Sequence, residues 1–522
     1  MTDDAAAPPD RHGRRLPDRC WVPAVGALLL ATLFAAALLV RAGGDASLLV
    51  HAAPPDTDAT LAPGSLTVQD ADDGFDGQFF YRLGVSPWST DEQVAGVTFD
   101  LPALRNARWG YGALAWAASG GDADLVPWSL LAVNLAAAAA LGAAGGALAR
   151  SSGRHAAWGL LVVLWPGFAY SLSLDTSELV ASALVVAALV AGRRRRWSLV
   201  GLALTGAVLV RDTTAVVPFG VAAAGAVAWF AAARPTSRLA RLAATGRPTR
   251  VEEPSVPDHL PATTTGDTSE QTAHLPATTP RGTAAKPDPT AHVPATTGSS
   301  DPVVARRRAD AVAQTRADAV AQRWAGSDTP VPVLAAGFVP LVVFGLWQLV
   351  QRARFGDLPL TSSGDNNLSA PLRGFVDLLG DAATEPSGET LFRAGFALGV
   401  VALLVAAGWS WRRTTAPLTE RLAWLPAVAV VVVLNAYLWS GATAFMRAAT
   451  EAGVLSIALL LAAPPAARRP VSPQATPGRT DPPATPDDRE APRRRAGLLP
   501  LLAAGLATGW LLTAAVQLAK LG

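Results

Sequence analysis

Long apolar segments, separated by short polar ones, occupy most of the chain. A helix needs about 20 apolar residues to cross a bilayer core. Apolar runs of about that length, and some shorter ones, predict helices at residues 21–40, 125–149, 156–174, 177–192, 197–210, 213–233, 331–350, 391–409, 422–439, a run ending near 463, and 498–519. We therefore predict an all-α protein, a polytopic transmembrane helix bundle of about eleven spans.

Two local features modify this pattern. The order Trp165-Pro166-Gly167 predicts a kink in the third span, because proline removes a helical hydrogen bond. Residues 109–119 are apolar and begin with aromatic side chains, but are too short to span. They predict an interfacial or re-entrant helix.

Composition agrees with a membrane protein. Half of the residues are hydrophobic, 16% are charged, and the mean hydropathy is +0.28. A net charge of +2 gives no reason to expect a nucleic-acid partner, whereas membrane lipid is an expected partner. The single cysteine, Cys20, excludes an intramolecular disulfide.

Charge clusters orient the predicted spans. Arg193 to Arg196 are four consecutive arginines, and further arginines precede residue 21. Basic residues stay on the cytoplasmic side, so we predict a cytoplasmic N-terminus and a multi-pass protein of the cell's inner (plasma) membrane. Mixed-charge clusters fall on the opposite, outer face: Asp175, Glu178, Arg211, Asp212, Arg447 and Glu451.

The same pattern divides the chain into six segments. They are a cytoplasmic tail (1–20), an N-terminal membrane module (21–233) with an extracytoplasmic acidic loop (41–108), a disordered cytoplasmic linker (234–330), a C-terminal membrane module (331–463), a second disordered cytoplasmic linker (464–497) and a final transmembrane helix (498–522). The first linker repeats HLPATT at His259 and His274. Its polar, proline-rich composition cannot bury a core.

The acidic loop contains three carboxylates within five positions: Asp72, Asp73 and Asp76. One such carboxylate could act as a general base on a hydroxyl group. Alternatively, Asp72 and Asp76 could hold a divalent cation through oxygen ligands. An equally weighted alternative is a solvated turn, because Asp and Gly are common turn residues.

Arginines near the outer face provide candidate phosphate ligands. Arg105 and Arg108 are three residues apart, so a helix would place both on one face. Guanidinium groups bind phosphate through paired hydrogen bonds; the alternative is interfacial anchoring by snorkelling. Glu178 and Arg211 lie at span ends, where ionisable groups are functional candidates. Their alternative role is mutual pairing that holds the bundle together.

Several motifs together resemble a known family. FDGQFFYR, from Phe75 to Arg82, resembles the YDGQFYYR-type loop of bacterial polytopic proteins that are similar to the C-type (GT-C) glycosyltransferases. Residues 100–111 match that group's D-x-P-x-x-R-x-x-R-x-x-Y pattern, although Gly112 stands where the group has proline. Arg211-Asp212-Thr213 resembles its R-E-T signature. Leu174 to Glu178 resembles its L-x-R-D-x-T-E exit without the arginine. The resemblance covers roughly residues 20–230.

This resemblance implies a GT-C-like fold and an outer-face glycosyltransferase. The enzyme would transfer a hexose or pentose, with inversion, from a polyprenyl-phosphate sugar donor to a glycan or lipid acceptor of the cell envelope. A divalent cation, Mg²⁺ or Mn²⁺, is compatible with the reaction but not required. The implied roles are a base at Asp76 or, as second choice, Asp73; phosphate binding by Arg105, Arg108 and Arg211; sugar binding by Gln78 and Tyr81; and orientation of arginines or acceptor contact by Asp175 and Glu178.

Two alternatives come from other classes of protein. A transporter or flippase of a lipid-linked intermediate would have internal repeats and ionisable residues in mid-span. A non-catalytic membrane scaffold, whose linkers recruit partners, would tolerate neutralisation of the acidic loop.

Overall fold

The computed structural model describes residues 18–233, 330–362, 368–463 and 498–521. All described residues except Ala232 and Ala233 belong to one compact unit that is mostly helical. Both expected membrane modules and the final helix contribute to it, so they are parts of one body. Nearly all of the expected cytoplasmic tail and of both expected linkers lies outside the described residues.

The first half of the chain supplies the following elements in order: α1 (Trp21–Arg41), η1 (Ala46–Leu49), α2 (Asp76–Val85), β1 (Gln93–Val94), β2 (Val97–Thr98), α3 (Pro102–Ala107), α4 (Trp109–Ser119), α5 (Val126–Ser151), η2 (Ala156–Gly159), α6 (Leu160–Val163), α7 (Gly167–Ser173), α8 (Glu178–Arg193), α9 (Trp197–Val210), η3 (Asp212–Ala215) and α10 (Val216–Ala233). The two strands pair antiparallel, with Val94 opposite Val97. Strand structure is otherwise restricted to isolated bridges in the described part of the chain.

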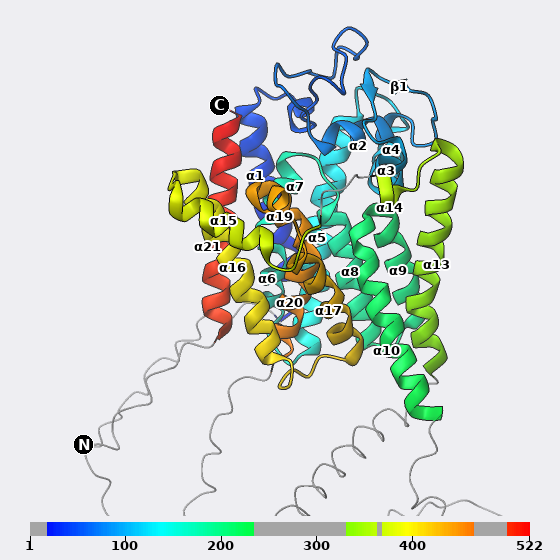
Figure 1. The fold of residues 1–522 in the computed structure, drawn as a ribbon, viewed down its shortest axis with the longest axis vertical. Helices are drawn as coiled ribbons and strands as arrows, with labels where there is room; N and C mark the ends of the chain where they lie inside the picture. Colours follow the sequence, from blue (N-terminus) through cyan, green and yellow to red (C-terminus); the bar gives the residue numbers. More distant parts are fainter. Residues whose placement is uncertain (1–17, 234–329, 363–367, 464–497, 522) are drawn as a thin grey trace, which may run out of the picture. The chain divides into compact units, whose positions relative to one another are not determined.

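The second half supplies α13 (Pro330–Phe355), α14 (Pro359–Ser362), α15 (Arg373–Thr384), α16 (Gly388–Ser410), α17 (Leu418–Val432), α18 (Ala436–Ser440), α19 (Ala442–Ala448), α20 (Thr450–Leu461) and α21 (Leu498–Lys520). Figure 1 shows the long helices of both halves running roughly along a common direction.

Six of the described helices are long and apolar enough to cross a membrane: α1, α5, the helix Asp212–Ala231, α13, α16 and α21. A seventh span results if α6 and α7 are counted together. They are bent by 65° at the predicted kink, which is confirmed. The all-α membrane class is therefore confirmed. The count of about eleven stays a prediction, since it includes shorter apolar helices such as α9 and α20.

Exposed apolar side chains along the long helices agree with a lipid-facing surface. Large hydrophobic side chains are exposed on α1, α10, α13, α16 and α21; examples are Leu33, Phe230, Leu346, Trp409 and Leu511. Exposure of so many such side chains to water would be costly.

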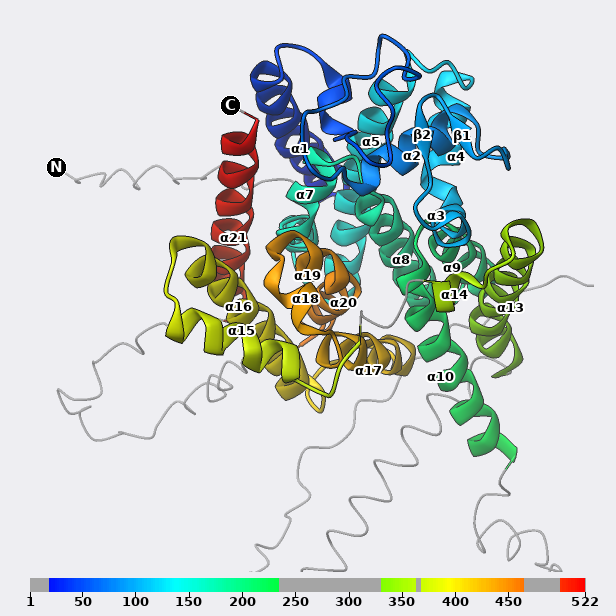
Figure 2. The ribbon, with the colours of Figure 1, turned by 45° about the horizontal axis from the view of Figure 1, so that its top comes forward.

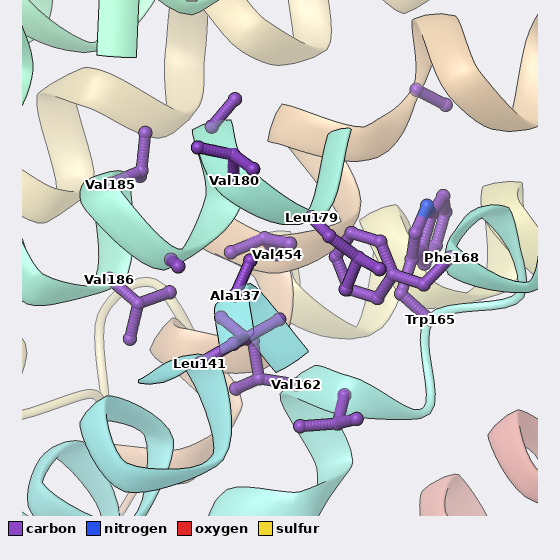
Figure 3. Close-up of a cluster of buried hydrophobic side chains, with 14 of the residues drawn as sticks. Ala137, Leu141, Val162, Trp165, Phe168, Leu179, Val180, Val185, Val186 and Val454 are labelled. Atoms are coloured by element: carbon purple, nitrogen blue, oxygen red, sulfur yellow. The ribbon is translucent and has the colours of Figure 1, made fainter. Parts of the chain in front are cut away.

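A shared hydrophobic core joins the two halves. At the break between α6 and α7, Trp165 and Phe168 lie beside Leu179 of α8 and Val454 of α20 (Figure 3). The Trp165 indole N–H donates to Met446 O and Thr450 Oγ1, each at 3.2 Å. At this break, the Trp165 side chain of the first half therefore packs against helices of the second half.

The loop between α1 and α5 folds over one end of the bundle, with α2, α3, α4 and the hairpin gathered there (Figures 1 and 2). Arg82 holds this layer together. Its guanidinium donates to the carbonyls of Glu92 (2.8 Å), Val97 (3.0 Å) and Asp91, and lies over the Phe99 ring. The hairpin is therefore fixed on α2, and α2 in turn packs on α4 and α5.

Candidate functional site

Four arginines and five carboxylates form one connected set of ion pairs. We call this set the arginine cluster. Its members are Arg105, Arg108, Arg211, Arg447, Asp76, Asp100, Glu178, Asp212 and Glu451. They come from α2, α3, α8, η3, α19 and α20 and from residues that flank α3 and α9. Such a concentration of charge is costly where water is scarce, so each group requires partners.

Asp76 is central to the arginine cluster. Its carboxylate accepts hydrogen bonds from Arg105 Nη1 and Arg447 Nη2, each at 2.6 Å, and Arg108 Nη1 lies 3.7 Å away. Gly77 permits this position: a Cβ there would lie 2.4 Å from Val50 O and 2.7 Å from Leu174 O. Because no side chain intervenes, the first turn of α2 sits directly on the backbone that precedes α8.

Arg105 and Arg108 both reach Asp76, so they lie on one side as their spacing predicted. Arg105 also forms a two-bond pair with Asp100, with both N–O distances 2.8 Å, and its guanidinium lies 4.1 Å from the Phe79 ring centroid. Arg108, which links α3 to α4, also pairs with Asp212 at 3.2 Å. Each arginine therefore keeps a second carboxylate besides Asp76.

Glu178 forms the deeper part of the cluster. Its carboxylate accepts from Arg447 Nε at 2.6 Å and from Arg211 Nη1, and the Ser171 hydroxyl donates to it at 2.9 Å. Arg211 also pairs with Glu451 at 3.1 Å. The pairing of Arg211 with Glu178, expected above as a structural alternative, is thus present in the structure.

Arg447 and Glu451 were absent from the site residues chosen by sequence. Arg447 bridges Asp76 and Glu178, which are far apart in the chain. Both missed residues carried one signal: they lie at a mixed-charge span end, on the same predicted face as Glu178 and Arg211.

The cluster changes what Asp76 can do. Burial alone would raise the pKa of Asp76, but the guanidiniums of Arg447, Arg105 and Arg108 outweigh burial and lower that pKa far below its usual range. A general base works best when its pKa is near the ambient pH. In this arrangement Asp76 is therefore an anchor for arginines and a weak base.

The geometry does not favour a metal ion at Asp72 and Asp76. Asp72 and Asp73 are exposed in the turn before α2, and neither takes part in the cluster. Among the described residues, no group of three or more His, Cys, Asp or Glu could hold a metal ion. The positive charge around Asp76 would also repel a cation. Asp73 likewise forms no ion pair with the arginines expected to hold phosphate.

Gln78 and Tyr81 do not face the cluster. Gln78 is buried and accepts hydrogen bonds from Thr57 Oγ1 at 2.7 Å and from the backbone N–H of Ala53 at 3.3 Å. Tyr81 is also buried, and its hydroxyl donates to Ala123 O at 3.3 Å. Both side chains therefore stabilise the loop layer, and their expected contact with sugar hydroxyls has no geometric support.

Asp175 lies in the turn between α7 and α8, outside the ion-pair set. It is fully buried, its backbone is left-handed (φ 43°), and neither carboxylate oxygen has a hydrogen-bond partner. Thus it neither orients an arginine nor lies open to an acceptor in this conformation.

An elongated apolar cavity of about 630 Å³ lies between α16 and α21. Its lining extends along α16 from Leu391 to Ala406 and along α21 from Leu498 to Leu512. At 1.5 Å per residue, each lining stretch is about 20 Å long. Trp165 and Met446 also line the cavity, and Met446 directly precedes Arg447 of the cluster. No cluster member lines the cavity, but Met446, which lines it, is the chain neighbour of Arg447 in α19.

These features define a helical membrane protein with a partly buried charge cluster and an apolar cavity. Comparisons of the chain with protein families, curated proteins and solved structures found no match.

Proposed function

We propose that the protein binds a lipid-linked phosphate and transfers the attached sugar to an envelope acceptor on the outer face. The adjacency of Met446 in the apolar cavity and Arg447 in the cluster carries this proposal. A polyprenyl phosphate has the matching parts, namely a long apolar chain and an anionic group. The motif resemblance to GT-C glycosyltransferases supports the choice of sugar transfer as the reaction.

The phosphate would bind where Asp76 now accepts hydrogen bonds. Arg105, Arg108 and Arg447 converge on Asp76, and guanidiniums bind phosphate through paired, charge-assisted bonds. Because Asp100, Asp212 and Glu178 hold the same three arginines, the guanidiniums stay in place when a phosphate replaces Asp76 as their partner.

This exchange would also activate Asp76. Once the phosphate takes the guanidiniums, the pKa of Asp76 rises toward its ordinary value, and Asp76 becomes a better base. An acceptor hydroxyl oxygen would attack the anomeric carbon, and Asp76 would take the hydroxyl proton. The bond from the anomeric carbon to the phosphate oxygen would break, its electron pair leaving with the lipid phosphate. Attack from the opposite face inverts the anomeric configuration, as the resemblance implies.

The transporter alternative predicted ionisable groups in mid-span. The buried ion pairs described here lie elsewhere: the arginine cluster is at the loop-covered end, and Arg193 pairs with Glu420 at the ends of α8 and α17. The competing function is a non-catalytic scaffold. Substitution of Asp76 distinguishes the two, because a scaffold would tolerate it and a transferase would lose activity.

The test of lipid-phosphate binding uses farnesyl phosphate and farnesol, which differ only in the anionic group. We expect farnesyl phosphate, but not farnesol, to raise the thermal stability of the purified full-length protein. Arg447→Met should abolish this shift. Arg193→Met is the matched control, because Arg193 also pairs with a buried glutamate but lies outside the cluster. Equal shifts by both ligands, or an unchanged shift in Arg447→Met, would refute the assignment.

The sugar is identified separately. A strain lacking the gene should accumulate the lipid-linked donor and lack one sugar of its cell-envelope glycan. An unchanged set of lipid-linked sugars and envelope glycans would contradict the transfer reaction, even if farnesyl phosphate binds.

A further inference from the structure

Unpartnered polar groups gather where α13 meets α3 and α4. Four residues there supply half of the buried side-chain N and O atoms that lack hydrogen-bond partners among the described residues. These atoms are Asn106 Oδ1, Trp109 Nε1 and both amide heteroatoms of Gln348 and of Gln351. The Arg108 position, at the edge of the arginine cluster, lies between Asn106 and Trp109 in the chain.

The two glutamines share the buried face of α13. Gln348 is 3% exposed and Gln351 is fully buried, and they are three residues apart. Leu346 and Leu349 point the other way and are exposed. The buried face of α13 packs on α9 and α3. Both amides therefore lie within the helix contact and away from the lipid-facing surface.

Aromatic contacts place this region beside the cluster. The Trp347 indole N–H donates to Ala107 O at 3.1 Å, at the end of α3. The Trp109 ring centroid is 5.9 Å from that of Trp347 and 4.7 Å from that of Trp88. Three indole rings thus form a row whose middle member, Trp109, follows Arg108 in the chain.

Packing alone does not account for the glutamines. A buried amide without a partner destabilises a fold, whereas leucine or methionine would fill a similar volume without that penalty. In a membrane helix the contrast is sharper, because the lipid offers no replacement hydrogen bonds. Two such residues at successive turns of one face point to a partner that the isolated chain lacks.

We propose that Asn106, Trp109, Gln348 and Gln351 form a binding site for a sugar ring. Two amides offer donors and acceptors, the indole offers a donor and Asn106 Oδ1 an acceptor, which matches an uncharged ligand rich in hydroxyls. Indole faces suit the apolar face of such a ring. The identification of this ring with the donor sugar rests on the proposed function, since Arg108 would hold the adjoining phosphate.

Entry of the ring requires the outer end of α13 to move from α3. That end is held by Trp347 on Ala107 and by Arg354, whose guanidinium donates to Trp88 O at 2.8 Å. Arg354 also donates to Ser89 O at 3.4 Å, so both residues hydrogen-bond to the loop layer through backbone carbonyls. Their release would uncover the amides without disturbing the ion pairs of Arg105 with Asp76 and Asp100.

The test measures binding of free monosaccharides to the purified full-length protein by saturation-transfer difference NMR. The probes are glucose, galactose, mannose, arabinose and ribose, tested singly. We expect at least one of them to bind saturably. The double variant Gln348→Met, Gln351→Met should bind it at least about tenfold more weakly, since an amide hydrogen bond contributes about that factor. Its melting temperature should equal or exceed that of the wild type.

Gln517→Met is the matched control, because Gln517 is a buried glutamine of α21 whose Nε2 is also unpartnered. It should bind the sugar as the wild type does. Absence of saturable binding by all five sugars, or wild-type affinity in the double variant, would overturn the site. Arg447→Met distinguishes the two proposals. It should lose farnesyl phosphate binding but keep free-sugar binding. The two assays use different ligands, so a failed phosphate assignment would not affect the test of the sugar site.

Discussion

Neutralising Asp76 should have opposite effects on binding and on transfer. In Asp76→Asn the carboxylate that competes with phosphate for Arg105, Arg108 and Arg447 loses its charge. We therefore expect the variant to bind farnesyl phosphate more tightly than the wild type does. Transfer should fall by about 10²–10⁴-fold, the usual contribution of a positioned base.

The fold should survive this change. Asp76 accepts two charge-assisted bonds at 2.6 Å, and such bonds contribute about 1.5–3 kcal/mol each. Asparagine keeps one oxygen acceptor, and each arginine keeps another carboxylate: Asp100, Asp212 or Glu178. We estimate a loss of about 2–4 kcal/mol, because no guanidinium is left without a partner. This loss should appear as a melting temperature lowered by several degrees.

The matched control is Asp100→Asn. Asp100 lies in the same network and pairs with Arg105, but it is about one-third exposed and does not contact Arg108 or Arg447. Its neutralisation should also strengthen farnesyl phosphate binding, while transfer stays within a few-fold of the wild type. Binding is measured by titration of thermal stability. Transfer is measured with the lipid-linked sugar that the deletion strain accumulates.

Two results would refute this reasoning. A wild-type rate of transfer in Asp76→Asn would show that Asp76 is not the general base, and would favour the non-catalytic scaffold. Weaker phosphate binding in a folded Asp76→Asn would show that the arginines need this carboxylate for their positions, so that phosphate does not replace it.

Three further predictions test other parts of the account. In a Cys20→Ser background, a cysteine at position 72 should react with an impermeant label outside intact cells and a cysteine at position 280 should not; the reverse would overturn the predicted orientation. Deletion of residues 245–300 should leave thermal stability and transfer unchanged, and loss of transfer with normal insertion would give that segment a direct role. Because the folded pKa of Asp76 is lowered, its stabilising effect is present above about pH 4, the ordinary value, and is lost as pH falls further. Wild-type thermal stability should therefore approach that of Asp76→Asn in acid, and a constant difference would contradict the low pKa.

Much of the helical layout follows from the apolar pattern. The limits predicted for residues 109–119 and 197–210 are those of α4 and α9. A segment in lipid has no water to hydrogen-bond its backbone N–H and C=O groups. An apolar run therefore forms a helix, in which these groups bond to one another. The predicted span 422–439 was less accurate. Its helix α17 ends at Val432, and the Asn435 side chain accepts a hydrogen bond from Leu438 N–H to begin α18.

Five of the nine cluster members were selected from the sequence: Asp76, Arg105, Arg108, Glu178 and Arg211. The sequence did not predict that Arg447 joins Asp76 to Glu178. The contact of Arg447 with Asp76 depends on the packing of α19 against α7 of the first half, which no local spacing determines. Gln78 was misassigned for a related reason: its bond to Thr57 exists only after residues 50–57 fold onto α2.

The bridge made by Arg447 has a consequence for how the protein is made. Asp76 and Glu178 enter the membrane region early in synthesis, whereas their common partner Arg447 follows after the 234–329 segment and several more helices have been translated. Until then Arg105, Arg108 and Arg211 are the only cluster arginines available to these two carboxylates. A nascent chain that stalls before residue 447 therefore contains an incompletely paired acidic site.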